Sequence, residues 1–192
     1  HPDEIRKVFD RELDTRICAD FPKINPAQIA IDPGLPKEKH MRWAALLRHQ
    51  TPEEAVAILR QLKLDNDTIS KAKILVQWWK RPIGADQTQI RKTMSQMVPE
   101  LYDDLLVLKA SVGEMELQAE ECVEDLDWVK AQSGEIRQRG DCVSLKELAV
   151  TGADLIQAGM RPGKELGETL KRLLELVLEH PEWNTKEILK KV

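Results

Sequence analysis

The chain has 192 residues, of which 42% are apolar and only 4% aromatic, and its formal net charge is −4. This length suffices for one sizeable core or two small helical units, and the composition favours helix over sheet. No apolar run approaches the ~18 residues that cross a bilayer, and we expect no signal peptide. The three cysteines (Cys18, Cys122 and Cys142) are an odd, widely spaced set that fits reduced thiols better than a disulfide framework or a zinc site. We therefore expect a cytoplasmic, all-α protein with reduced thiols and no membrane partner.

The charge is distributed unevenly along the chain. Residues 36–96 carry twelve Lys/Arg against six Asp/Glu, whereas residues 100–135 carry two against eleven. Blocks of opposite sign allow a basic face beside an acidic one, and a basic face suits a polyanion. Charges that only solvate helix surfaces would give the same pattern, so both interpretations stay open.

The N-terminal half shows a series of helix signals. Apolar spacing predicts a helix over 3–17, and the prolines between Pro22 and Pro36 predict a loop. Further helices are expected through 41–47, from a capping box at Thr51, and from Asp65 or Asn66 to Arg81. Short connections between these three indicate an antiparallel helical array. The chain opens on His1-Pro2-Asp3 rather than Met, so we expect it to be part of a longer protein.

The C-terminal half continues in helices. Asp86 is a candidate cap for a helix over 87–97, and Pro99 opens another that reaches about Val112. A long acidic helix is expected over 114–132, then a linker between Gly134 and Gly140, then a helical tail whose last helix follows Asn184. The expected fold is an elongated helical array, or body, followed by a smaller helical tail. The expected divisions are 1–35 (truncated helix and Pro-rich linker), 36–112 (body), 113–143 (acidic helix and linker) and 144–192 (tail).

The most informative stretch, residues 151–177, predicts two helices joined by a tight turn. Gly159 fits a left-handed helix C-cap, and Pro162 suits the turn and the first residues of the next helix. Gly163 and Gly167 would leave the first turns of that helix bare, so a phosphate could reach its unpaired N–H groups. The candidate RNA-binding residues are Arg161, Gly163, Lys164, Gly159, Gly167, Lys171 and Arg172. A hairpin that uses Gly and Pro only for its turn remains the structural alternative.

Residues 145–170 are similar to the C-terminal signature of bacterial tRNA nucleotidyltransferases, the CCA-adding enzymes. In that family a leucine-rich lead-in, a Thr-Gly-x-Asp-Leu helix and a Gly-x-x-Pro-Gly-x-x-x-Gly turn occur in this order. A weaker likeness to the helical body of the family covers residues 42–47, 54–59 and 62–66. Together these similarities cover most of residues 36–192.

The resemblance implies an elongated enzyme with head, neck, body and tail. Body and tail would hold the phosphate backbone of tRNA on its acceptor and T-arm side, while the head adds CTP and ATP with Mg²⁺. The implied contacts are Arg161, Gly163 and Lys164, with Lys171 and Arg172 depending on which side of their helix they occupy. The chain itself would need no cofactor, and its partners would be tRNA and its own catalytic head.

The sequence also departs from the family pattern. The Gly-Gly-x-x-Arg-Asp segment, the metal-binding Asp-x-Asp pair of the head and the Glu-Asp-x-x-Arg of the neck do not occur. Asp65-Asn66-Asp67 has the Asp-x-Asp spacing, but we interpret it as a helix cap. His40 and His49 lack the His-Asp pair of a phosphohydrolase centre and are interpreted as packing or surface residues. We therefore assign no catalytic or metal-binding residue and expect the chain alone to be inactive.

Two other functions stay open. A helical protein–protein or oligomerisation module would use the acidic helix and the apolar stripes. The other alternative is the C-terminal part of a related poly(A) polymerase-type enzyme, whose catalytic part would likewise be missing. Trp78 and Trp79 in a basic helix could stack on bases, although adjacent helical residues point about 100° apart and at least one should be core.

Overall fold

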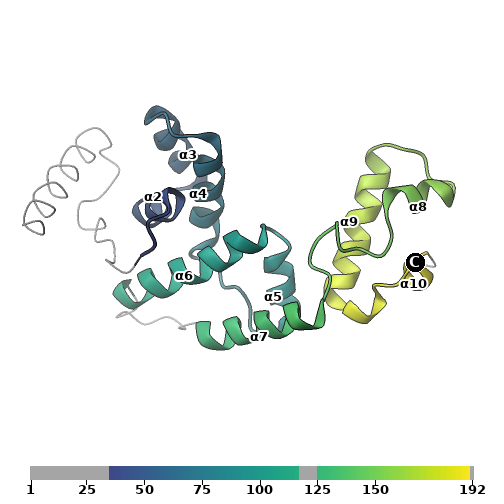
Figure 1. Ribbon diagram of the computed structural model, residues 1–192. Helices are drawn as coiled ribbons and strands as arrows, with labels where there is room; N and C mark the ends of the chain where they lie inside the picture. The colour runs from purple at the N-terminus through teal and green to yellow at the C-terminus, as the bar shows by residue number, and fades with distance from the viewer. Residues whose placement is uncertain (1–34, 117–124, 191–192) are drawn as a thin grey trace, which may run out of the picture. The chain divides into compact units, whose positions relative to one another are not determined.

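The structure, a computed structural model, describes residues 35–116 and 125–190 (Figure 1). The helix expected over 3–17 and most of the Pro-rich segment lie outside the described residues. Within these residues the chain forms nine α-helices and one 3-10 helix and no strand, which confirms the all-α fold class. None of the described helices is long and apolar enough to cross a membrane.

The described residues divide into two compact units. Unit 1 contains residues up to Pro82 and those from Asp103 to the gap, and unit 2 contains residues 83–102 and the chain from the gap onward. The domain boundaries expected from the sequence remain a prediction.

Unit 1 is built around helix α4 (Asn66–Trp78), against which α2 (Lys39–Leu47) and α3 (Pro52–Gln61) pack. Helix α6 (Pro99–Glu116) contributes its residues from Asp103 onward. The fully buried side chains of this unit are aliphatic or Met, and the largest are Met41, Leu47, Leu59, Leu75, Leu105 and Leu108.

Helix caps in unit 1 agree with the sequence signals. The hydroxyl of Thr51 accepts from the N–H of Glu54 at 3.2 Å, and the carboxylate of Glu54 accepts from the N–H of Thr51 at 3.1 Å, so the predicted capping box is present. Asp65 accepts from the N–H of Thr68 at 2.8 Å, and this bond lowers the pKa of the Asp65 carboxyl. The interpretation of Asp65 as a helix cap is confirmed.

The first part of unit 2 consists of α5 (Gln87–Met94), the first residues of α6 and α7 (Leu126–Arg139). Asp86 caps α5 as predicted, through the N–H of Gln89 at 2.8 Å. The hydroxyl groups of Tyr102 and Ser133 lie 2.7 Å apart in the interior, and Ser133 also donates to the Val129 carbonyl. These bonds satisfy the polar groups that α6 and α7 bury.

The expectation of one helix over 114–132 followed by a linker from Gly134 is wrong. Asp125 adopts a non-helical backbone and accepts from the N–H of Trp128 at 2.9 Å, so a new helix begins at Leu126. Gly134 lies inside that helix, because Val129, Ser133 and Ile136 form a buried face across it. Only Gly140, at φ +72°, ends the helix.

The second part of unit 2 is the tail, which contains α8 (Gly152–Gln157), α9 (Lys164–Glu179), the 3-10 helix η2 (Pro181–Trp183) and α10 (Lys186–Leu189). Leu173 and Val177 of α9 are buried, and Leu166, Leu170 and Leu174 pack against the same core. These five side chains form one apolar stripe along α9. The core is completed by residues of the preceding loop, α8 and α10, which are Cys142, Leu148, Val150, Leu155 and Leu189.

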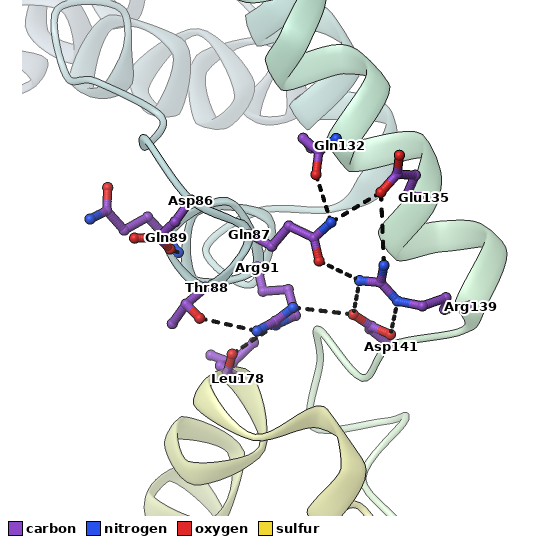
Figure 2. Close-up of polar contacts among 10 residues, drawn as sticks. All are labelled: Asp86, Gln87, Thr88, Gln89, Arg91, Gln132, Glu135, Arg139, Asp141 and Leu178. Carbon is purple, nitrogen blue, oxygen red and sulfur yellow. Dashed lines mark hydrogen bonds and ion pairs between the residues drawn. The ribbon is translucent and has the colours of Figure 1, made fainter.

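The end of α9 is joined to α5 by the buried guanidinium of Arg91 (Figure 2). Its Nε donates to the carbonyl of Leu178 at 2.7 Å, and its terminal nitrogens bond Thr88 at 3.1 Å and Asp141 at 3.3 Å. The side chain of Asp141 is only 7% exposed. Its carboxylate also pairs with the guanidinium of Arg139, at an N–O distance of 2.9 Å. The Asp141 carboxylate thus pairs with two guanidinium groups, and α5, α9 and the segment after α7 meet at this network.

We expect Arg91→Met to lower the free energy of unfolding by about 3 kcal/mol. The substitution leaves the Leu178 carbonyl and part of Asp141 without their buried partner, and bonds to charged groups are each worth ~1.5–3 kcal/mol. Urea denaturation followed by circular dichroism measures the loss.

The matched control is Lys92→Met on the next residue. The Lys92–Glu179 pair has a 2.7 Å separation, but both side chains are nearly half exposed, so its loss should cost under about 1 kcal/mol. Equal effects of the two substitutions would contradict the structural role given to Arg91.

Candidate nucleic-acid interface

The turn between α8 and α9 begins with a left-handed glycine, as the sequence predicts. Gly159 has φ +103°, its N–H donates to the Ile156 carbonyl, and the N–H of Met160 donates to the Leu155 carbonyl, both at 3.0 Å. This pair of bonds is the Schellman arrangement that ends a helix. Met160 packs against the tail core.

The second helix of the hairpin starts at Lys164, two residues after Pro162, which is expected among its first residues. Gly163 is the N-cap of α9, with φ +154°, so it does not belong to the first turn, and Pro162 lies outside the helix. An L-residue rarely adopts this backbone conformation, which explains a glycine here. The N-cap carries no side-chain hydrogen bond, so the first amides of α9 have no side-chain acceptor.

This open end differs from most helix starts in the described part of the chain. A Thr or Asp side chain caps α3, α4, α5, α7, α8 and α10. In α9 the N–H groups of Lys164, Glu165 and Leu166 instead point out of the end of a 16-residue helix. Their partial positive charge adds to that of nearby side chains.

Two cations flank the open end of α9. Arg161 is exposed and has no partner among the described residues, and Lys164 is 92% exposed. The amino group of Lys164 lies 3.6 Å from the carboxylate of Glu168, but such an exposed pair is weak, at ~0.3–0.5 kcal/mol. Both cations are therefore available to an anion that approaches the amides.

The remaining candidates lie along the exposed side of α9. Gly167 is in the helix, and a Cβ there would meet nothing within 4 Å. Lys171 and Arg172 are both exposed. At about 100° per residue, Lys171 lies close to the face of Lys164, whereas Arg172 is turned away by roughly 80°. Glu168 and Glu175 interrupt this face, so positive charge is concentrated at the N-terminal end of α9.

The Thr-Gly-x-Asp-Leu segment before the turn has a structural role. Thr151 and Asp154 form a capping box for α8, Leu155 is buried, and a Cβ on Gly152 would lie 3.4 Å from Leu166. Hydrogen bonds from Thr151 are the main cause that lowers the pKa of the Asp154 carboxyl, and Lys186 of α10, at 2.9 Å, adds to it. The segment thus holds α8 against α9 and α10, and Lys186 is a contributor that the sequence pattern did not reveal.

The other candidates from the sequence are placed as follows. His40 lies 2.7 Å from Asp104, and the ring of His49 meets Trp79 edge-on at 5.9 Å. The described residues contain no group of three or more His, Cys, Asp or Glu suited to a metal ion. Cys142 is buried in the tail core, where desolvation raises the pKa of its thiol to about 11.

The lowered pKa of Asp154 predicts an acid-sensitive tail. A carboxyl whose folded pKa is depressed stabilises the fold above its unfolded pKa of ~4, and this contribution is lost as the pH falls toward the folded pKa. We expect Asp154→Asn to be less stable than the parent at pH 7, and the difference to shrink progressively below about pH 4. Thermal unfolding across this range measures it, and a difference independent of pH would contradict the prediction.

The raised pKa of Cys142 predicts an inert thiol. Because the thiolate is the reactive form, iodoacetamide should modify Cys142 at pH 8 far more slowly in the folded chain than in urea. Peptide mapping by mass spectrometry measures both rates. Equal rates would show that the tail core around Cys142 is open.

Comparison with known proteins assigns this hairpin to a family. The family model of tRNA nucleotidyltransferase domain 2 matches residues 36–192, which includes every candidate residue of the interface. No curated protein and no solved structure matches the chain. Because the family match covers well over half of the 192 residues, the chain belongs to the tRNA nucleotidyltransferase family, of which residues 36–192 form domain 2.

Proposed function

We propose that this chain binds tRNA for a tRNA nucleotidyltransferase and that the N-terminal end of α9 holds a phosphate of the tRNA backbone. The observation that carries the proposal is a helix end without a side-chain cap, flanked by the exposed cations Arg161 and Lys164. The family membership supports tRNA as the polyanion.

Physical chemistry supports a phosphate at this position. Three convergent N–H groups and the positive end of the helix dipole form a site for a tetrahedral anion. Gly163 at the N-cap has no side chain that could occupy the amides, and a Cβ on Gly167 would meet only open space. A backbone segment of RNA can therefore approach the end of α9 closely.

The chemistry of the interface favours contact with phosphate and shape over the reading of bases. The groups at the turn are amides and two cations, which bond phosphate oxygens in any sequence. Arg161 and Lys164 can each neutralise one of two neighbouring phosphates, which gives only a modest salt dependence, a slope of roughly −1.5 in log K against log salt. We propose that the acceptor and T-arm side of tRNA is held here, and that nucleotide addition with Mg²⁺, CTP and ATP takes place on a catalytic head.

We expect Arg161→Ala with Lys164→Ala to weaken tRNA binding roughly tenfold at low salt and to reduce the salt slope by about 1.5. Fluorescence anisotropy of labelled tRNA at several salt concentrations measures both quantities. Circular dichroism should show an unchanged fold, because both side chains are exposed.

The matched control is Lys130→Ala with Lys146→Ala, which removes the same charge from two other exposed positions of unit 2. Its effect on tRNA affinity should be within about twofold, because long-range effects of exposed charges are screened. Parent-like binding by the Arg161/Lys164 variant would overturn the interface. If the mass of that variant also rose with concentration, a protein-contact module would be the better interpretation.

The variant Gly167→Ala tests whether position 167 carries glycine so that RNA can approach the helix. Ala is more favourable than Gly inside a helix by ~1 kcal/mol, and a Cβ at position 167 meets nothing within 4 Å, so the variant should be more stable. The added methyl group points toward the N-terminal end of α9 and should hinder the RNA backbone. Higher stability with unchanged tRNA affinity would show that RNA does not approach this side.

A further inference from the structure

A second exposed cluster of cations and aromatic surface lies at the C-terminal end of α4 in unit 1. The guanidinium carbon of Arg81 stands 5.2 Å from the centroid of the Trp78 ring. Lys80 and Arg81 are exposed, and neither pairs with a carboxylate in the part of the chain that the structure describes. We propose that Trp78, Lys80 and Arg81 form a stacking site for single-stranded RNA.

The two adjacent tryptophans have different surroundings. The indole N–H of Trp79 is buried, and its ring meets His49 edge-on, so Trp79 packs inward. Trp78 is half-buried, and its own N–H has no acceptor among the described residues. The inward Trp79 anchors the end of α4, and the neighbouring Trp78 keeps aromatic surface at the protein exterior.

Two hydrogen bonds to backbone carbonyls fix the position of the cluster. The amino group of Lys109, on α6, donates to the Arg81 carbonyl at 2.7 Å, and the N–H of Arg81 donates to the Trp78 carbonyl at 3.0 Å. Cations near a helix C-terminus often serve only to satisfy its last carbonyls. Here Lys109 donates to the Arg81 carbonyl. The guanidinium of Arg81 therefore stays over the Trp78 ring, and the amino group of Lys80 stays in solvent.

The chemistry of these groups suits an unpaired nucleotide. A base stacks on an aromatic ring or on a guanidinium plane, and a flanking cation binds the adjoining phosphate. A duplex keeps its bases stacked on each other and offers no free face to Trp78. The site therefore favours single-stranded over double-stranded RNA, in contrast to the phosphate contact proposed at α9. The inference uses the RNA-binding role proposed above but none of the residues of the α9 interface.

The test measures binding of a labelled single-stranded RNA of about 12 nucleotides, and of a duplex of the same length, to the whole chain. Trp78→Leu should weaken single-strand binding about tenfold, in line with the loss of one base–aromatic stack, while Trp78→Tyr should stay within about threefold of the parent. Arg81→Gln should weaken it about threefold and reduce the salt slope by about one. Duplex binding should change less than twofold in all three variants.

The matched control is Arg60→Gln, which removes an exposed cation from the last turn of α3 and should change single-strand binding by less than about twofold. Circular dichroism establishes that each variant is folded. The proposal is overturned if the parent does not bind the single strand at low salt, if Trp78→Leu binds like the parent, or if Trp78→Tyr loses as much as Trp78→Leu. An equal loss in Arg60→Gln would also overturn it, because non-specific charge attraction would then explain the binding.

The Arg161/Lys164 double variant distinguishes this site from the proposed function. It should lose affinity for tRNA but keep affinity for the short single strand. Parent-like tRNA binding by that variant would overturn the α9 interface without affecting the conclusion about Trp78. The opposite pattern, with tRNA binding lost and no effect of Trp78→Leu on the single strand, would remove only the Trp78 site.

Discussion

The direction of α9 depends on one buried cation. Arg91 reaches the last turn of α9 at the Leu178 carbonyl, and the nearly buried carboxylate of Asp141 balances its charge. A buried guanidinium is tolerated only when its hydrogen bonds are largely satisfied, so α5, α9 and the segment after α7 must meet in one geometry. The other end of α9, about 22 Å away along the helix, carries the open amides. The network thus sets where the proposed phosphate site lies within unit 2.

The ends of the helices are used in two ways. Thr and Asp side chains satisfy the first amides of six helices, each contributing about 1 kcal/mol, whereas α9 begins at Gly163 without such a bond. A helix that forgoes this contribution keeps its amides free for a ligand. Other interactions supply the stability that this open end lacks. These are the packing of the tail core around Leu173 and Val177 and the capping box of Thr151 and Asp154.

Local chemistry made much of this fold and site predictable. The cap residues Thr51, Asp65 and Asp86 and the left-handed Gly159 were found from the sequence because each acts within a few residues of itself. The sequence predicts the wrong start and end for helix α7. Its N-cap Asp125 stands in an acidic run that gives no distinct cap signal, and tertiary packing of the buried face of α7 overrides the cost of Gly134 inside the helix. Sequence periodicity does not reveal the role of Arg91, because its partners Asp141 and Leu178 lie 50 and 87 residues away along the chain.

The proposed phosphate site consists of the amides at the start of α9. The most direct measurement follows the backbone amide chemical shifts of the chain by NMR during titration with tRNA. We expect the amide signals of Lys164, Glu165 and Leu166 to move together with saturating behaviour, and we expect high salt to reverse the change. If tRNA binds while these three signals stay in place, the phosphate is held elsewhere and the proposed site is wrong.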